Sequence, residues 1–177
     1  MVLIRTCQSA RAPGTSDCQT GPMAPERIEV SRLIQASPAA IFAVLRDPKG
    51  HVAIDASGSL MSSDDQPVEK VGDRFTVHMD RDAINDFPLG LYDVTIEITR
   101  YVPDAAIEWT ILGSFEPPIG HVYGYTLETT DEGTRVTSYC DWSALHERYR
   151  ERITFPIIPE ASLRATLGIL ARTVQAA

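Results

Sequence analysis

The chain contains four histidines, the side chains whose charge changes nearest to neutral pH. His121 falls on the apolar side of an alternating segment, where its imidazole could act as a general base or lie in solvent at a strand end. His51 and Asp55 stand four residues apart and would share one face of a helix. They are candidates for an acid–base pair or a gate at a pocket mouth, and the alternative is an exposed polar turn. We therefore take His121, His51 and Asp55 as the candidate catalytic residues.

A second set of polar side chains is interleaved with apolar residues in three alternating segments, residues 106–112, 120–129 and 134–142. Tyrosine and tryptophan bury a large area and still offer a hydrogen-bond donor, which suits the orientation of a ligand carbonyl or hydroxyl. The alternative is that these aromatic rings only pack the core. The predicted ligand-binding residues from these segments are Trp109, His121, Tyr123, Tyr125 and Ser138.

Arg32 stands on the apolar side of the segment 27–36, in line with Val30 and Ile34. An arginine buried at that position would need an anionic partner. It could meet a ligand carboxylate, pair with an acidic side chain, or extend past the strand end into solvent. We add Arg32 to the predicted ligand-binding residues.

The sequence predicts neither a metal site nor a cofactor. The histidines, including His78 and His146, lack the spacing of a metallopeptidase or facial-triad site, and Cys7, Cys18 and Cys140 match no zinc pattern. The sequence also lacks a glycine-rich dinucleotide loop, a P-loop and a GxSxG motif. The odd number of cysteines favours a reducing compartment, and we predict a cytoplasmic protein.

Strands with a single apolar face must position these side chains. In residues 91–100, for example, Tyr92, Val94, Ile96 and Ile98 alternate with polar residues, which is typical of a half-buried strand. Short turns join the strands, so sequence neighbours are expected to run antiparallel. The predicted strands cover residues 27–36, 59–63, 73–80, 91–100, 106–112, 120–129 and 134–142.

Helices are predicted after the first strand and at the end of the chain. Ser37 and Pro38 suit an N-cap and a first helical residue, and Pro48 ends that helix. Residues 49–57 form either a second short helix or a loop. The last helix is predicted over residues 160–175, where an apolar stripe recurs at helical spacing. The stripe consists of Leu163, Leu167, Leu170 and Val174.

Because each strand has only one apolar face, the sheet must bury that face against another element. The last helix is the large apolar partner that the sequence offers, and one helix cannot fill the concave side of a long curved sheet. We therefore predict an α+β architecture, with a curved antiparallel sheet of about seven strands around a long C-terminal helix and an apolar pocket between them. Residues 81–90 and 143–159 are predicted to be irregular.

Composition argues against several classes of function. The 177 residues are 44% hydrophobic and 23% charged, as expected of a globular domain with its own core. The net charge of −8 repels phosphate backbones, so nucleic acid is not an expected partner. No run approaches the roughly 18–20 apolar residues that a membrane helix needs, so stable membrane insertion is not expected.

The ligand-binding domain is expected to occupy residues 26–177. Residues 1–25 are rich in Ser, Thr, Gly, Pro and Ala without periodicity, and we predict a disordered leader. The first apolar run ends at Arg5 and is too short for a signal peptide. Translation could begin at Met1 or at Met23, which stands just before the first patterned segment.

Four stretches carry a resemblance to a known superfamily. They are Ile28–Phe42 (IEVSRLIQASPAAIF), Val71–Phe75 (VGDRF), Glu97–Trp109 (EITRYVPDAAIEW) and Gly133–Ser143 (GTRVTSYCDWS). In order and spacing they resemble the START/Bet v1-like (SRPBCC) superfamily, particularly its polyketide cyclase/dehydrase-like branch. The resemblance implies the helix-grip fold and a cavity for a lipid, polyketide, sterol or other hydrophobic molecule. It does not imply one reaction, because the superfamily includes carriers, cyclases, co-chaperone domains and parts of oxygenases.

Three functions follow as hypotheses. The first is intracellular binding of a hydrophobic or amphiphilic small molecule in the cavity, as a carrier or sensor. The second is an enzyme of the polyketide cyclase or dehydratase kind, with a histidine as base and tyrosines as hydrogen-bond donors. The third is a module that binds a protein partner. In each case we expect a monomer or a homodimer.

Overall fold

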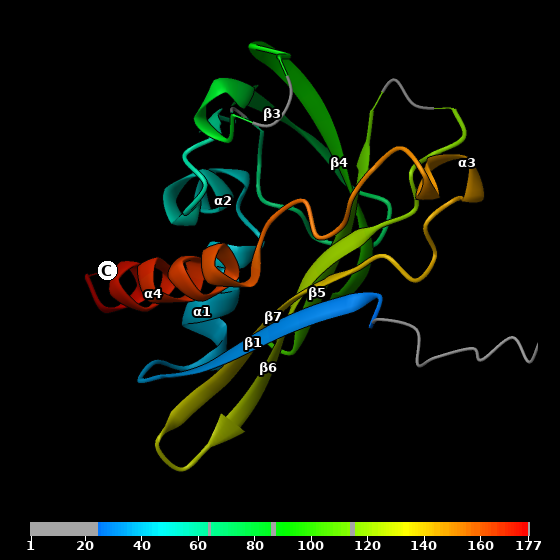
Figure 1. Cartoon of the computed structure of the whole chain (residues 1–177). Coiled ribbons are helices and arrows are strands. Elements are labelled where there is room, and N and C mark those ends of the chain that lie inside the picture. The colour runs from blue at the N-terminus through cyan, green and yellow to red at the C-terminus, as the bar shows by residue number, and fades with distance from the viewer. Residues whose placement is uncertain (1–24, 64, 86–87, 114–115, 177) are drawn as a thin grey trace, which may run out of the picture.

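The computed structural model describes residues 25–63, 65–85, 88–113 and 116–176. Within these residues one antiparallel sheet carries all the strands (Figure 1). The strands are β1 (Arg27–Ile34), β2 (Leu60–Ser62), β3 (Arg74–Asp80), β4 (Leu91–Val102), β5 (Ala106–Leu112), β6 (Val122–Thr130) and β7 (Gly133–Asp141). Their order across the sheet is β1-β7-β6-β5-β4-β3-β2, so β1 and β2 form its edges.

The described helices are α1 (Pro38–Leu45), α2 (Pro48–Ile54), α3 (Glu147–Arg150) and α4 (Glu160–Ala176), with a 3₁₀ turn η1 (Arg81–Ala83). Helices α1, α2 and α4 contact one another on the same face of the sheet, while α3 lies apart from them (Figure 1). This arrangement confirms the predicted helix-grip fold. The predicted leader, residues 1–25, lies almost wholly outside the described residues.

Two short helical segments lie where the sequence analysis predicted irregular chain. Helix α3 falls within residues 143–159, and its first turn is capped by His146, whose Nδ1 accepts a hydrogen bond from the Arg148 N–H at 3.2 Å. The turn η1 falls within residues 81–90 and is capped by Asp80. Both segments are too short for apolar periodicity to reveal them.

A proline divides the predicted helical region after β1 into two helices. The Ser37 hydroxyl caps α1 by accepting a hydrogen bond from the Ala40 N–H at 3.2 Å. The Asp47 side chain caps α2 in the same way through the Lys49 N–H, with Pro48 as the first helical residue. Because a residue before proline avoids the helical region, α1 ends and α2 starts in a new direction.

One side of the sheet, the inner face, packs against the helices. The α4 stripe predicted from the sequence is buried there, with Leu167 1% exposed and Leu170 0% exposed. Helix α4 rests on β1 and β7, and it also contacts α1 and α2. Val136 from β7 and Ile34 from β1 complete this closed part of the core. The position of α4 over one edge of the sheet decides which part of the inner face this helix leaves uncovered.

Candidate functional site

Several apolar and aromatic residues on the inner face are only partly buried, although their strand neighbours on the same face are core residues. They come from the middle of the sheet, whose inner side lies outside the main contact region of α4 within the described chain. We call this region the open inner face. It consists of Tyr92, Val94, Trp109, Ile111 and Tyr123.

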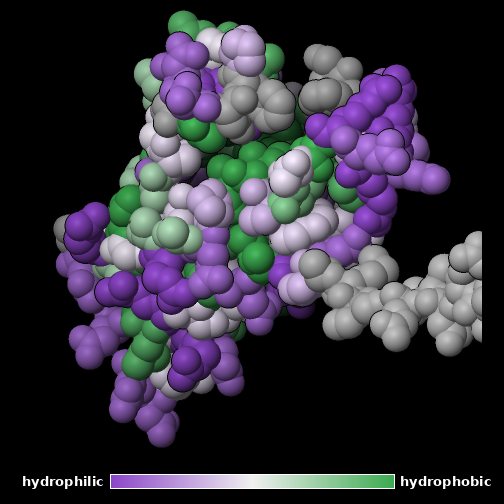
Figure 2. Space-filling view, in the orientation of Figure 1, coloured by the Kyte–Doolittle hydropathy of each residue, from purple (hydrophilic) through white to green (hydrophobic). Residues whose placement is uncertain are grey.

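Strand register brings these residues together. Trp109 of β5 is paired with Tyr123 of β6, and Tyr123 is paired with Cys140 of β7. Ile111 is opposite Ile96 of β4, two residues from Val94 on the same side of that strand. Figure 2 shows apolar residues gathered over the middle of the corresponding side of the molecule, where it is hollowed between α2 and α3. The site is therefore an apolar hollow over the sheet.

Trp109 is the centre of an aromatic cluster. Its ring lies 6.3 Å from the Tyr123 ring in a stacked arrangement and 5.8 Å from the Tyr125 ring in a tilted one. The His51 ring approaches Trp109 edge-on at 4.7 Å between centroids. These separations fall in the range of favourable aromatic pairs, so the cluster is a preformed surface rather than a set of independent side chains.

The tyrosines of this cluster have small polar neighbours on β7. Ser138 is the cross-strand partner of Tyr125, and Cys140 is the cross-strand partner of Tyr123. Burial is the main reason that the pKa of Tyr125 rises to about 12 and that the pKa of Tyr123 rises well above its usual value. Both phenols therefore stay protonated near neutral pH and can act as hydrogen-bond donors.

His51 lies inside the core rather than at a pocket mouth. It is 6% exposed, and its Nε2–H donates to the Leu45 carbonyl at 2.7 Å. Its ring also contacts the Phe75 ring at 5.3 Å. Burial lowers the pKa of His51 to about 4, against the opposing effects of the Leu45 hydrogen bond and the Asp47 charge, so the imidazole is neutral at pH 7.

Asp55 does not form the predicted pair with His51. It follows the last residue of α2 as the C-cap, and its carboxylate turns into the α2–β2 loop. There it accepts hydrogen bonds from the Ser57 N–H at 2.9 Å, the Ser57 hydroxyl at 2.7 Å and the Leu60 N–H at 3.0 Å. The Asp55 charge also raises the pKa of Tyr125, so the loop lies near the inner face.

His121 is buried, which excludes the solvent-exposed strand end considered above. It is 2% exposed, and neither ring nitrogen has a hydrogen-bond partner among the residues that the structure describes. Its ring packs against Tyr123 at 5.4 Å and Phe155 at 5.1 Å. Burial lowers the pKa of His121 to about 4. The segment between β7 and α4 encloses this histidine in a second, smaller apolar cluster, which includes Ile119, Leu145 and Tyr149.

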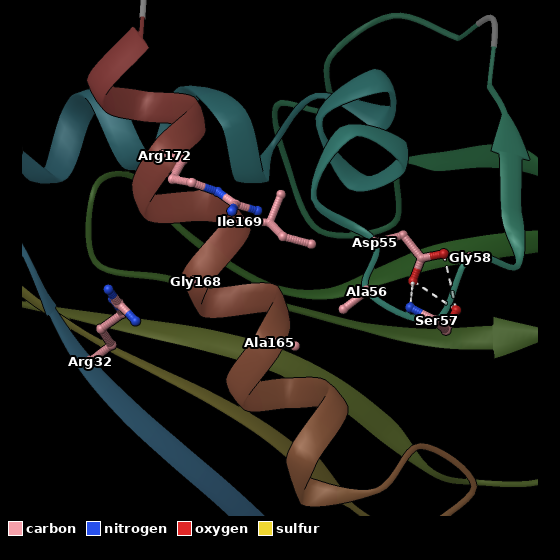
Figure 3. Close-up of a pocket in the computed structure, with 9 residues that line it drawn as sticks. All are labelled: Arg32, Asp55, Ala56, Ser57, Gly58, Ala165, Gly168, Ile169 and Arg172. Carbon is pink, nitrogen blue, oxygen red and sulfur yellow. Dashed lines mark hydrogen bonds between the residues drawn. The ribbon is translucent and has the colours of Figure 1, made fainter.

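Arg32 has the predicted strand parity but not the predicted surroundings. It pairs with Val136, which is fully buried on the inner face, yet the Arg32 side chain is exposed. The reason is local, because β1 is an edge strand and the arginine passes beside Gly168 of α4, where no side chain covers it. Arg32 lines an open groove of about 670 Å³ across α4 (Figure 3).

The structure thus separates the predicted site residues into three places. Trp109, Tyr123, Tyr125 and Ser138 lie together at the inner face, with His51 against them. His121 lies at the border between this face and the smaller cluster. Arg32 and Asp55 lie at the groove. The sequence analysis missed Tyr92 as a site residue although its parity places it on the same face, and it missed Arg172, whose role in the groove depends on how α4 sits on the sheet.

Two further observations concern metal ions and membranes. Among the described residues, no group of three or more His, Cys, Asp or Glu side chains is arranged to hold a metal ion. No described helix has both the length and the apolar character required to cross a membrane. The aromatic cluster of the site can supply apolar contact, aromatic stacking and hydrogen-bond donation by neutral phenols.

Sequence comparison gives distant relatives only. No protein-family model matches the chain. An uncharacterized protein of Mycobacterium tuberculosis, Rv0088, is 28% identical over an alignment of 153 residues that covers 82% of this chain and 63% of that protein. A counterpart from a second strain of the same species is 27% identical over the same shares of the two chains. This chain thus spans less than two thirds of the length of the curated relatives it matches.

Solved structures give a clearer likeness. An AHSA1-like protein from Aeromonas hydrophila has a TM-score of 0.56 at 19% identity, covering 85% of this chain and 92% of that one. A protein from Mycobacterium smegmatis has a TM-score of 0.60 at 17% identity, with 85% and 92% coverage. The Aha1 dimer from Colwellia psychrerythraea has a TM-score of 0.51 at 21% identity, with 85% and 94% coverage. At these identities the likeness establishes the fold and leaves the ligand open.

Proposed function

We propose that this protein binds a hydrophobic or amphiphilic small molecule, such as a lipid, polyketide or sterol-like compound, against the open inner face. The observation that carries the proposal is the partial exposure of Trp109 and Tyr123 on the side of the sheet that forms the core. Large aromatic side chains on a core-facing surface are normally covered, and an uncovered apolar hollow is a common mark of a binding site.

The arrangement of the rings favours a ligand with a flat or elongated apolar body. Trp109 and Tyr123 are stacked and inclined to each other by only 26°, so the pair forms a rigid aromatic surface for an apolar ligand. Tyr123 also carries a neutral hydroxyl, which we infer orients a carbonyl or hydroxyl group of the ligand. We infer that Tyr125 and Ser138 support the floor of this site, because both are almost fully buried.

The two tryptophans of the chain, Trp109 and Trp142, allow a direct test. In the Trp142→Phe variant, Trp109 is the remaining tryptophan, and titration with the uncharged probe N-phenyl-1-naphthylamine should change its emission in a saturable way. The converse variant, Trp109→Phe, should give little change in Trp142 emission. A response confined to Trp142, or none in either variant, would contradict binding at the open inner face.

The natural ligand can be sought by native mass spectrometry of the protein purified from its own host. We expect a bound apolar compound of defined mass, lost on denaturation. A consistently empty protein that also shows no thermal shift with lipid and polyketide panels would argue against the proposal. Placement in the polyketide cyclase/dehydrase-like branch would gain support if that compound were a polyketide.

An enzymatic role of the cyclase or dehydratase kind has less support from the same geometry. A base must reach its substrate and have a pKa near the working pH, whereas His51 and His121 are buried with pKa values lowered to about 4. Asp55 is already engaged by Ser57 and Leu60. If an identified substrate is turned over, His121→Ala and Asp55→Asn test the remaining candidates, and unchanged turnover in both would exclude them.

The boundaries of the domain, its compartment and its oligomeric state are also proposals. We infer that residues 26–177 form the binding unit, that it acts in the cytoplasm, and that it is a monomer or a homodimer. A chain that begins at Met23 should keep the same unfolding midpoint and probe affinity as the full chain. A lower midpoint would show that residues before Met23 contribute to the folded unit.

A further inference from the structure

A groove crosses α4 and is lined by residues that differ from those of the open inner face. Its volume is about 670 Å³, and it is bounded by β1 on one side and by the α2–β2 loop on the other (Figure 3). Two arginines from different elements line it, Arg32 from β1 and Arg172 from α4. The floor between them is made by small residues of the helix, Ala165 and Gly168.

Neither arginine has a carboxylate partner among the residues that the structure describes. In the part of the chain that the structure describes, Arg32 and Arg172 make no hydrogen bond or ion pair with any residue. Elsewhere on the surface, Arg74 is paired with Glu97, and Arg164 is paired with Glu160 one turn earlier on α4. Two unpaired guanidinium groups therefore share one depression on a chain whose net charge is −8.

Gly168 keeps the floor of the groove open. A Cβ placed on this residue would lie 3.8 Å from Nη1 of Arg32, so alanine would just fit and a longer side chain would meet the guanidinium group. Glycine in the middle of a helix is less stable than alanine, so its presence in α4 is not explained by helix formation. It does allow Arg32 to cross beside the helix.

The acidic side of the groove does not neutralise these arginines by direct contact. Asp55 also lines the groove, but its two carboxylate oxygens are directed to donors of its own loop, from Ser57 and Leu60. In Figure 3 this hydrogen-bonded loop lies on the opposite side of α4 from Arg32. In the same view the Arg172 side chain crosses α4 toward Ile169 on the loop side, so the two guanidinium groups reach the groove from opposite sides of the helix.

We propose that this groove binds an anionic group, a phosphate or a carboxylate, held between the guanidinium groups of Arg32 and Arg172. A guanidinium group offers planar, paired N–H donors that match the oxygens of these anions. The anion is either a free small ion or the head of an amphiphile, and both present the same oxygens. This site does not rest on the ligand proposed for the open inner face.

Titration of the ¹⁵N-labelled full chain with inorganic phosphate at low ionic strength tests the proposal. Saturable shifts are expected at the Gly168 amide and at the Arg32 and Arg172 Nε–H signals. Arg32→Gln and Arg172→Gln should each weaken binding by about tenfold, as expected when a charge-assisted contact is lost. Both residues are exposed, so the variants should fold, and the amide spectrum reports this directly.

Two controls separate a specific site from general attraction of anions. Arg164→Gln removes the same charge from the same helix outside the groove, and it should leave the phosphate affinity unchanged. Gly168→Met fills the floor without changing charge, and it should weaken binding as much as either arginine variant. Equal losses in Arg164→Gln and Arg172→Gln, or an unchanged affinity in both groove variants, would overturn the proposal.

Dodecyl phosphate below its micelle concentration identifies the source of the anion. An affinity equal to that of inorganic phosphate, with shifts confined to the groove, assigns a free ion. A much higher affinity that still depends on Arg32 and Arg172 assigns the head of an amphiphile. Binding of dodecyl phosphate that ignores both arginine substitutions, with no saturable phosphate binding, would overturn the groove site while leaving binding at the open inner face intact.

Discussion

The two parts of the inner face belong to one sheet but are completed in different ways. Over β1 and β7, leucines of α4 close the surface, and Leu170 is fully buried. Over β4, β5 and β6, Trp109 and Tyr123 remain partly exposed, and α2 contributes His51 at the border. The closed part is aliphatic and has few hydrogen-bonding groups, whereas the open part is aromatic and carries phenols.

This difference indicates that the two parts of the core have different roles. Aliphatic packing under α4 supplies stability because close-packed methyl groups gain most from exclusion of water. The aromatic part keeps a broad surface that needs no further side chain to stay ordered, since its rings support one another. A ligand can then bind without disturbing the elements that hold the fold together.

The largest expected effect is on stability in the closed part. Leu170→Ala should lower the free energy of unfolding by about 3 kcal/mol, because it leaves a cavity in a fully packed region. Ile111→Ala in the open part should cost only about 1 kcal/mol, since that side chain is already partly in contact with solvent. Urea denaturation with a common slope measures both changes. A cost for Ile111→Ala that matches Leu170→Ala would mean that the open part is in fact covered.

The second-largest effect is expected from acid. A lower pH should reduce the free energy of unfolding, because two buried histidines pack against the aromatic rings of the open inner face. Each has a folded-state pKa of about 4, below the ordinary value of 6.5, so the unfolded chain binds the proton more readily. The stabilisation is complete above pH 6.5 and is lost as the pH falls toward 4. Between pH 7 and pH 5 the loss should be about 2 kcal/mol for each histidine.

Urea denaturation of wild type and His121→Phe at several pH values measures this effect. The variant keeps an aromatic ring between Tyr123 and Phe155 but cannot titrate. Between pH 7 and pH 5, the free energy of unfolding of the variant should fall by about 2 kcal/mol less than that of the wild type. The same pH dependence in both proteins would show that His121 is not held neutral by burial.

Much of the fold was predictable from the sequence, because alternation assigns a face to each strand residue without knowledge of the tertiary structure. The pairing of Trp109 with Tyr123 and of Tyr125 with Ser138 follows from that parity once the turns are located. The position of α4 was not predictable in this way. An apolar helix stripe shows that the helix packs on the sheet, but not which strands it covers.

The environments of the polar candidates also depended on tertiary structure. The burial of His121 requires Phe155, more than thirty residues later, to fold over it. Asp55 and His51 have helical spacing, but α2 ends before Asp55, and nearby loop donors take its carboxylate. Local hydrogen bonds of this kind compete with any longer-range pair and leave no periodic signal in the sequence.

Ligand affinity should respond to Trp109 more than to any residue of the closed part. Trp109→Ala should weaken binding of N-phenyl-1-naphthylamine by about tenfold, because it removes the largest stacking surface. Leu170→Ala should change the affinity of the folded protein by less than about twofold. Probe fluorescence, measured without urea where both variants are fully folded, compares the two affinities. If the two variants weaken the probe equally, the ligand lies under α4 instead.

The smallest effect is expected at the boundary between the two parts, where the buried Ser138 is the cross-strand partner of Tyr125. Ser138→Ala removes a buried hydroxyl beside the Tyr125 ring and should cost about 1 kcal/mol of stability. Because Ser138 is itself 3% exposed, the probe affinity should stay nearly constant. Thermal unfolding and probe titration of the same sample distinguish support of the floor from direct contact with the ligand. A larger change in affinity than in stability would extend the open inner face to Ser138 and place its edge under α4.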